Sequence, residues 1–405
     1  MSSKSDRELA EQEAIPGEQA YNNEDTAHLN SSVKNFMTSG ESDVTKLKAP
    51  VWINEGDSMI SRNLSQVYTD HFLDIPLGST PEERLLRAMR FFFSHFSVNL
   101  LTKKKPFNPI TGEFFRGSYS PGENSPHKGR KIVSYSELIN HRPIVIGFHM
   151  EDVPTEEGGQ PTVQYYGAIE IQAGFSGMTI RVKVLGDCFI RLPQHNETYR
   201  FNLPLSVLRG LLVGKSFMDM NGETKFECLE TGLSASINFK EKPWFFGQYR
   251  NISATVRNAK DKKIYKLDGN WGKSIDLENL ETGEKVPNFF LRDVALEIPV
   301  TMAPVEEMEE LESVRLWEPV VTPLRAGDNP AAERAKDALE HLQRVLLKEV
   351  DENRYTYEPI LFAPGPEEEI KKSTAPTFVL RPDHASRVSR SWLPDMVKIA
   401  SAAKK

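Results

Sequence analysis

Hydrophobic positions change their spacing twice along this chain. Between Pro81 and Leu101, six apolar residues keep the 3.6-residue period of a helix. They are Leu85, Leu86, Met89, Phe92, Phe93 and Phe96. Thr80 before Pro81 is typical of an N-cap followed by proline at the first helical position. We therefore predict a buried helix over about residues 80–101.

Residues from about 102 to 300 follow the two-residue period of strands instead. Apolar and polar residues alternate in Thr179–Val184 and again in Leu233–Phe239. Turn signals such as Asn221-Gly222 and Asp268-Gly269-Asn270 separate the runs. Many short strands without helices between them predict an antiparallel sheet curled into a barrel or sandwich. No fixed repeat length recurs, so the pattern does not indicate a propeller.

From about residue 301 the spacing is helical again. Asn329 is predicted to be an N-cap, with Pro330 at the first helical position, and Ala335, Leu339, Leu342 and Leu346 form one apolar stripe after it. Residues 51–405 are therefore predicted to form one α+β, mostly β domain. Its C-terminal helical part would cover about residues 301–405.

The N-terminal region has a different character. Residues 1–26 are polar, acidic and poor in large aliphatics, which predicts a disordered tail. Residues 27–50 carry a short helical pattern at Leu29, Val33, Phe36 and Met37. No apolar run in this region is typical of a signal peptide. The most apolar segment, residues 85–101, contains Arg87, Arg90 and His95, so no membrane span is predicted.

Composition narrows the class of protein. The 405 residues carry a net charge of −7, whereas wholesale nucleic-acid binding needs a basic surface. Two cysteines, Cys188 and Cys228, make neither a disulfide framework nor a zinc site, which indicates a reducing compartment. We predict a cytoplasmic protein whose contact with membranes is transient and peripheral.

A lysine-rich turn follows the predicted helix. Lys105–Glu113 reads KPFNPITGE and comes directly after Lys103-Lys104. Pro106 and Pro109 remove two backbone donors, and Gly112 permits a backbone angle that other residues avoid. Such a turn can offer amides and ammonium groups to a phosphate. The alternative is an ordinary solvated turn, and we expect Lys105 at the surface in either case.

Two further basic segments can be interpreted in two ways. Ser136–Pro143 places His141 and Arg142 on a loop before the strand that starts at Ile144. Lys336, Glu340 and Arg344 are spaced four apart, so they line one face of the last predicted helix. Solvated side chains are the simple interpretation of both segments, with Lys336 at the surface. The functional interpretation is that they bind a phosphate, for which arginine offers a planar fork.

Catalytic and metal-binding patterns are weak. Gly210–Ser216 is one residue short of a phosphate loop. Cys188 and His195 are close in sequence but are interpreted as a core cysteine and a loop histidine. His141, His149 and Glu151 have no recognised metal-ligand spacing. We predict no enzyme activity, no metal and no cofactor.

The lysine-rich turn resembles the KPFNPxxGE signature of the oxysterol-binding-protein-related family of lipid-transfer proteins. Ser136–Pro143 lies where this family carries its EQVSHHPP fingerprint. Further matching positions are Thr231-Gly232, Phe239-Lys240, Trp271, Glu312-Ser313, Leu316-Trp317, Asp328, Ala332, Lys336, Glu340, Gln343 and Arg344. The resemblance runs from about residue 50 to 360.

This resemblance implies a near-closed antiparallel β-barrel with a hydrophobic lipid tunnel, flanking helices and an N-terminal lid, here residues 27–50. Family members carry a sterol or phosphatidylserine and exchange it for phosphatidylinositol 4-phosphate between membranes. The implied headgroup-binding residues are Lys105, Phe107, Asn108, His141, Arg142, Lys336, Glu340 and Arg344. Lys105, His141, Lys336 and Arg344 would meet phosphates. The backbone around Phe107 and Asn108 would meet the headgroup, and Glu340 would orient the cations.

The fingerprint differs from the family pattern at several positions. Leu138, Ile139 and Asn140 replace Gln, Val and Ser, Arg142 replaces the second histidine, and Ile144 replaces the second proline. Arginine keeps the positive charge, so phosphate binding is compatible with it while the headgroup choice stays open. Two alternatives to a carrier remain: a lipid sensor or scaffold that signals through partners, and a lipid-acting enzyme. The absence of a nucleophile–base pair disfavours the enzyme.

Overall fold

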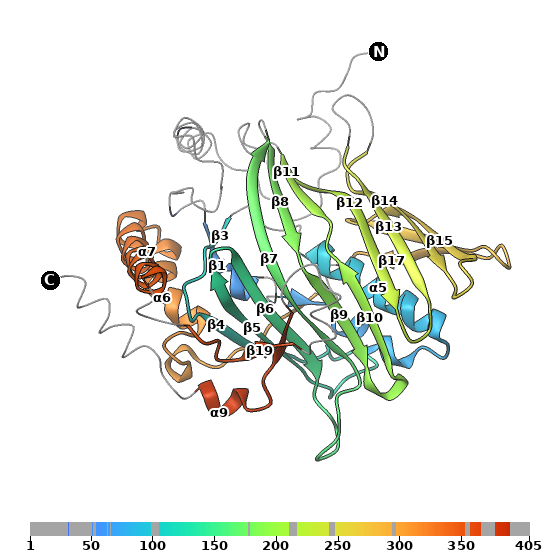
Figure 1. Ribbon diagram of the computed structural model, residues 1–405, viewed down its shortest axis with the longest axis horizontal. Helices are drawn as coiled ribbons and strands as arrows, with labels where there is room; N and C mark the ends of the chain where they lie inside the picture. Colours follow the sequence, from blue (N-terminus) through green and yellow to red (C-terminus); the bar gives the residue numbers. More distant parts are fainter. Residues whose placement is uncertain are drawn as a thin grey trace, which may run out of the picture.

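A large, strongly twisted sheet dominates the computed structural model of this protein (Figure 1). The structure describes residue 31 and residues 51–388 apart from 52–53, 63, 65, 99–104, 177–178, 210–216, 243–247, 294–296, 353–356 and 366–376. The tail predicted at 1–26 and nearly all of the segment predicted as a lid lie outside the described residues. So does the near-match to a phosphate loop at 210–216. The predicted mostly β fold around an antiparallel sheet is confirmed.

The sheet has 14 strands, all joined by antiparallel pairing. They are β4 (Phe114–Tyr119), β5 (Ile132–His141), β6 (Ile144–Asp152), β7 (Gln164–Ser176), β8 (Thr179–Leu185), β9 (Asp187–Leu192), β10 (Glu197–Asn202), β11 (Leu205–Arg209), β12 (Phe217–Cys228), β13 (Ser234–Lys240), β14 (Asn251–Arg257), β15 (Lys263–Asn270), β16 (Ser274–Asn279) and β17 (Lys285–Leu291). Short strands form three separate pairs: β1 (Asn54–Ser58) with β3 (Lys105–Phe107), β2 (Gln66–Val67) with β18 (Ile298–Pro299), and β19 (Phe362–Pro364) with β20 (Phe378–Leu380).

The sheet divides where its two longest strands change partners. The first half of β7 pairs with β9 and its second half with β8. In the same way, β12 pairs with β10 at one end and with β11 at the other. Since β8 also pairs with β11, and β9 with β10, the six strands form a ring of pairings. The strands β17 and β4 stand at the two ends of the whole order.

Helix α5 (Pro81–Val98) covers one face of the sheet and is the helix predicted at this position. Thr80 Oγ1 accepts a hydrogen bond from the Glu83 amide at 3.1 Å, so the predicted cap is present. Phe92 packs edge-on against Phe201 and Phe226 of the sheet, with ring centroids 5.4 and 5.1 Å apart. Burial of a side chain of this size contributes about 1.5–3 kcal/mol, so the aromatic face of α5 holds the main core together.

The remaining described helices are α3 (Met59–Arg62), α4 (Thr69–Leu73), η3 (Ile75–Leu77), η5 (Pro193–His195), η8 (Val305–Glu307), α6 (Ser313–Arg325), α7 (Asn329–Asp351) and α9 (His384–Val388). Helices α6 and α7 lie together beside the β5–β6 side of the sheet (Figure 1). Asp328 Oδ1 accepts from the Ala331 amide at 3.0 Å, so the capping side chain of α7 is Asp328 and not the predicted Asn329.

A second apolar cluster joins α6 and α7 to the lysine-rich turn. Leu346 of the predicted stripe is buried in it, and Ala335, Leu339 and Leu342 pack against it. Phe107 and Trp317 belong to the same cluster. The two helices therefore hold the turn in place.

Candidate functional site

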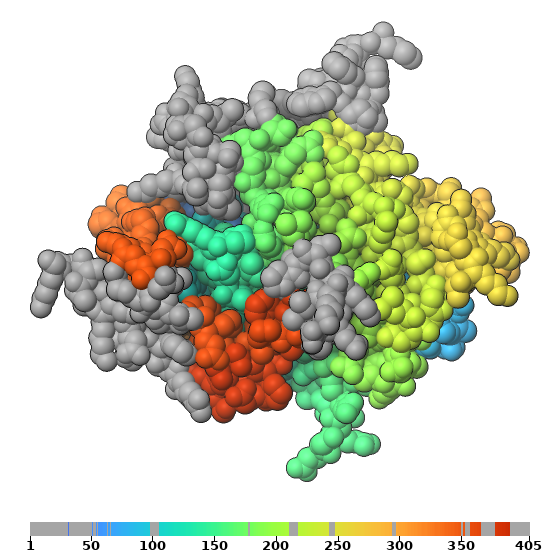
Figure 2. Space-filling view, in the orientation of Figure 1, coloured from blue at the N-terminus to red at the C-terminus, as the bar shows by residue number. Residues whose placement is uncertain are grey.

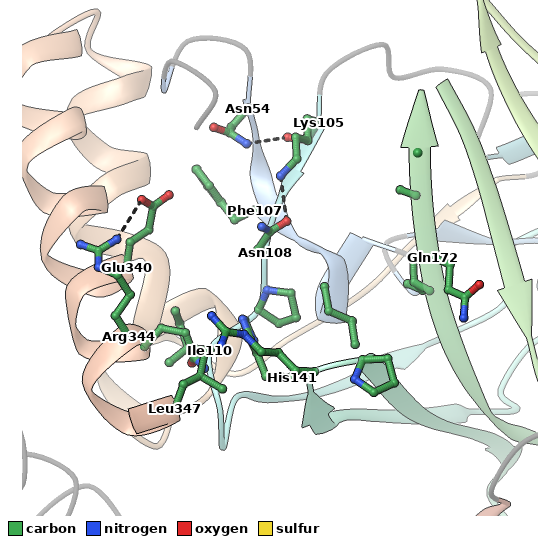
Figure 3. A pocket seen from close by; sticks show the side chains of 18 of the residues that line it. Asn54, Lys105, Phe107, Asn108, Ile110, His141, Gln172, Glu340, Arg344 and Leu347 are labelled. Carbon is green, nitrogen blue, oxygen red and sulfur yellow. Dashed lines mark hydrogen bonds and ion pairs between the residues drawn. The ribbon is translucent and has the colours of Figure 1, made fainter. Parts of the chain in front are cut away.

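A pocket of about 930 Å³ opens between α7, the lysine-rich turn, the β5–β6 turn and the β7–β8 hairpin (Figure 3). All eight headgroup residues expected from the resemblance line it: Lys105, Phe107, Asn108, His141, Arg142, Lys336, Glu340 and Arg344. The space-filling view shows the orange helical region beside the teal and green strands on this side of the molecule (Figure 2). The fold thus brings four separated sequence segments to one cavity.

The lysine-rich turn is held rigidly against α6. The rings of Phe107 and Trp317 stack with centroids 4.3 Å apart and planes 3° apart. The buried carboxylate of Glu113 accepts hydrogen bonds from the Ile110 amide at 2.9 Å, Ser313 Oγ at 2.6 Å and Trp317 Nε1 at 3.1 Å. The Phe107 ring and the Glu113 carboxylate therefore position the turn.

The side chain of Gln343 connects α7 to the same turn through two hydrogen bonds. Gln343 Oε1 accepts from the Thr111 amide at 2.7 Å, and Gln343 Nε2 donates to Thr111 Oγ1 at 3.0 Å. Gly112, the next residue, has a φ of 86°, the left-handed conformation expected of it. The positions of the α7 side chains in the pocket are therefore fixed relative to Lys105.

Lys105 is half-buried, which corrects the expectation that it lies at the surface. Its Nζ donates to Asn108 Oδ1 at 2.8 Å, and its carbonyl accepts from Asn54 Nδ2 at 3.0 Å (Figure 3). Burial, and then the charge of Lys336, lower the Lys105 pKa to about 8, against an opposing effect of Glu340. A charge in this position is costly until an anion arrives.

Lys336 is also buried, at 5% exposure, so the surface position expected for it is wrong as well. Its Nζ lies 3.1 Å from Glu340 Oε1. The other oxygen of Glu340 lies 3.9 Å from Arg344, whose side chain is 61% exposed. The predicted ion pairs between residues four apart are therefore present. They run from the exposed Arg344 through Glu340 to the buried Lys336, and so do not lie on a fully solvated helix face.

His141 is the last residue of strand β5, and Arg142 begins the tight turn into β6. The sequence predicted a loop here, but the pairing of β5 with β6 continues as far as His141 and Ile144. The Arg142 side chain is 60% exposed and lies 4.0 Å from Asp351 of α7. It therefore stands at the rim of the pocket.

The His141 ring is neutral. Burial, and then the neighbouring Arg142, lower its pKa to about 4, and a hydrogen bond to the Pro109 backbone opposes this only partly. Since proline offers only a carbonyl, the His141 ring donates to it. Its Nδ1 has no hydrogen-bond partner among the described residues. In this state Nδ1 is an acceptor, so His141 can donate to a phosphate only after gaining a proton.

Sequence reasoning missed the cations on the opposite wall. Arg181 and Lys183 of β8 line the pocket, together with Gln172 of β7. The alternating pattern of Thr179–Val184 was a usable signal, because it places Arg181 and Lys183 on the same side of one strand. Among the described residues, the lining contains six cationic side chains and a single carboxylate. This concentration of positive charge contrasts with the net charge of −7 of the chain.

The residues of the catalytic and metal-binding patterns considered above do not form a common site in the described part of the structure. Cys188 is fully buried in β9, and burial raises its pKa well above the usual range. His195 bonds to the Pro76 carbonyl at 2.8 Å. His149 pairs with Glu151 at 3.0 Å, whereas His141 lines the pocket. No group of three or more His, Cys, Asp or Glu side chains within the described part of the chain could hold a metal ion.

A comparison with known families decides the identity of the chain. The family model described as oxysterol-binding protein matches residues 31–326. This chain belongs to the oxysterol-binding protein family. The match ends before α7, so Lys336, Glu340 and Arg344 lie beyond it. As predicted from the sequence, membership makes this a lipid-binding protein and not an enzyme.

Individual relatives agree with this assignment. The chain is 30% identical over 325 residues to protein kes1 of Schizosaccharomyces pombe, covering 77% of this chain and 80% of the relative. It is 28% identical over 361 residues to human oxysterol-binding protein-related protein 10, covering 83% of this chain and 45% of the relative. Family membership therefore rests on most of the chain.

Two solved structures share the fold. One is the Osh1 ORD domain in complex with cholesterol, with a TM-score of 0.72, 20% identity and coverage of 94% of this chain and 93% of the other. The second is the Osh3 ORD of Saccharomyces cerevisiae in complex with PI(4)P, with a TM-score of 0.62, 20% identity and coverage of 89% and 93%. Within the described residues of this chain, no helix is long and apolar enough to cross a membrane.

Proposed function

We propose that this protein carries a sterol or phospholipid and exchanges it for phosphatidylinositol 4-phosphate between membranes. In this proposal the phosphorylated headgroup binds at the pocket, and the protein works in the cytoplasm with transient contact to anionic membranes. Lys105, Lys336 and Arg344 meet phosphate oxygens. Glu340 orients the last two, and the Arg142 fork reaches the headgroup from the rim.

One observation carries the proposal: Lys336 is buried, Lys105 is half-buried, and both line the same pocket. Burial, and then repulsion by Lys336, lower the Lys105 pKa, while Glu340 is the single carboxylate of the described lining. Lys336 lies 3.1 Å from Glu340 and 3.9 Å from Glu333, which is outside the lining, and Glu340 also acts on Lys105, so a dianionic phosphate would be a further counter-ion for both ammonium groups. A simple surface salt-bridge ladder would not need this burial.

The apolar side of the pocket is compatible with a lipid. Ile144, Ile171 and Phe175 belong to its lining, and Ile171 packs against the main core. Sterol rings or acyl chains need such a surface, away from water. Of the two solved structures, that of the Osh1 domain is a complex with cholesterol and that of the Osh3 domain is a complex with PI(4)P. Mass spectrometry of the lipids that co-purify with the protein would identify the sterol or phospholipid that it carries.

A liposome assay tests the proposal directly. Donor vesicles contain phosphatidylinositol 4-phosphate and acceptor vesicles contain a sterol or phosphatidylserine, each with a fluorescent reporter. We expect counter-transport that requires both lipids. Binding without net transfer would contradict the carrier and favour the sensor or scaffold.

Arg142 should make only a modest contribution to headgroup affinity, because 60% of its side chain is exposed to solvent. We expect Arg142→Ala to weaken phosphatidylinositol 4-phosphate binding about tenfold, at the lower end of a charge-assisted hydrogen bond. Arg142→His should recover part of the loss. Arg191→Ala, an exposed strand arginine that is not part of the pocket lining, is the matched control. Equal affinity of Arg142→Ala and the parent, in the same titration, would remove Arg142 from the headgroup site.

Affinity should also depend on pH through Lys105. Because its pKa in the folded protein is about 8, we expect headgroup binding to weaken as pH rises from 7 to 9. The folded pKa lies below the usual lysine value of 10.5, so the cost of the buried charge is fully present below pH 8. The unliganded protein should therefore gain stability between pH 8 and about 10.5. A Lys105→Arg variant, which keeps its charge, should show neither trend in titration and urea unfolding.

A further inference from the structure

The two walls of the pocket carry separate groups of cations. Lys336 and Arg344 come from α7, whereas Arg181 and Lys183 come from β8. Figure 3 shows Gln172 of β7 across the pocket from Glu340 and Arg344. In the strand pairing, Lys183 lies opposite Gln172, so the β8 cations belong to the Gln172 wall.

The positive charge of the β8 wall is incompletely balanced. Arg181 lies 3.2 Å from Glu241, but Glu241 also pairs with Arg209 and accepts from Asn221 at 2.9 Å. One carboxylate thus serves two guanidinium groups. Lys183 is exposed and makes no ion pair with any carboxylate in the described part of the chain. Net positive charge therefore remains on this wall.

The negative charge of an inositol lipid with one phosphomonoester is smaller than the positive charge of the pocket lining. Such a headgroup carries one phosphodiester charge and about −1.5 to −2 on its phosphomonoester. The described lining holds six cations, and Glu340 subtracts one charge. The cations of the lysine turn, the β5–β6 turn and α7 are sufficient for these two phosphates. Among the described residues, Lys183 on the β8 wall then remains without an anion, and Arg181 has only the carboxylate that it shares with Arg209.

We propose that Arg181 and Lys183 form a second anion subsite, and that the preferred headgroup of this pocket is an inositol bearing two phosphomonoesters. This inference rests on the proposed function, in which an inositol phosphate occupies the pocket. The same cations could instead meet an anionic bilayer around the mouth. The headgroup is favoured because both side chains line the cavity that holds Lys105 and Lys336.

Water-soluble short-chain lipids separate these cases, because they offer a headgroup without a membrane surface. Calorimetric titration at constant ionic strength would compare phosphatidylinositol 4-phosphate with phosphatidylinositol 4,5-bisphosphate. We expect the parent to prefer the bisphosphate. Arg181→Gln/Lys183→Gln should lower bisphosphate affinity about tenfold, as for a lost charge-assisted contact, while affinity for the monophosphate changes less than about twofold. Lys183→Gln alone, which breaks no ion pair among the described residues, should shift the ratio in the same direction.

Lys263→Gln is the matched control, since Lys263 is an exposed strand lysine of β15 and is not part of the pocket lining. An unchanged ratio in both β8 variants would overturn the second subsite. The same conclusion follows if they weaken only the binding to phosphatidylserine vesicles. A parent that binds the monophosphate without preferring the bisphosphate would contradict this inference alone. A parent that binds neither lipid would contradict the proposed function as well.

Discussion

Lys105→Met is expected to abolish most phosphoinositide binding and at the same time to stabilise the folded protein. The headgroup loses a buried cation, which should reduce affinity about 10- to 100-fold, as for a charge-assisted hydrogen bond. The fold loses a charge whose pKa is lowered from 10.5 to about 8, a penalty of up to roughly 3 kcal/mol. Loss of the hydrogen bond to Asn108 offsets part of this gain. Urea unfolding and lipid titration would measure the two effects on the same sample.

The control for this change is Lys128→Met. Lys128 is 61% exposed and pairs with Glu123, which is 84% exposed, so neither stability nor binding should change appreciably. A less stable Lys105→Met protein would show that the ammonium group serves the fold. A stable protein with full lipid affinity would instead remove Lys105 from the headgroup site.

Glu113→Ala should have the largest effect on stability. It removes the acceptor of three buried donors: the Ile110 amide, the Ser313 hydroxyl and the Trp317 indole. Leaving buried donors unsatisfied costs about 1–3 kcal/mol each, so we expect a loss of about 3 kcal/mol or more. The turn would also move relative to α6, and lipid affinity should fall although Glu113 is not part of the pocket lining.

Glu113→Gln provides the conservative comparison, because its amide keeps one acceptor oxygen and places an NH₂ group among donors. Its stability should lie between the parent and Glu113→Ala. Glu123→Ala, at an exposed position, should match the parent. If Glu113→Ala unfolds within about 1 kcal/mol of the parent, the carboxylate does not anchor the turn.

Local patterns predicted much of this molecule. The helix at Pro81 and the alternating strands around Thr179 and Ser234 follow from hydrophobic period, because one face of each is buried. The resemblance supplied eight residues that the fold brings to one pocket. Their roles in binding remain predictions.

Local sequence patterns could not predict which charged side chains are buried, or which distant segments come into contact. Lys336 looks solvated on a helical wheel, and it is buried only because the lysine turn packs against α7. Strand alternation placed Arg181 and Lys183 on one face but could not show that this face meets a pocket. The lowered pKa of His141 depends on burial of the ring and on the neighbouring Arg142 in the folded protein. Each of these properties arises between segments distant in sequence.

The contact between Thr111 and Gln343 spans 232 positions, and it sets the order in which the site can come into being. As the chain is synthesised from its N-terminus, the apolar sheet is complete long before α7 leaves the ribosome. Until then, one wall of the mouth and two of its cations are missing, and the turn lacks its Gln343 partner. The apolar surface of the sheet is thus available before α7, whereas Lys336 and Arg344 join the headgroup site only after residue 329 has been synthesised. A nascent chain stalled before residue 329 should therefore bind phosphoinositides more weakly than the 405-residue chain, because it lacks Lys336 and Arg344.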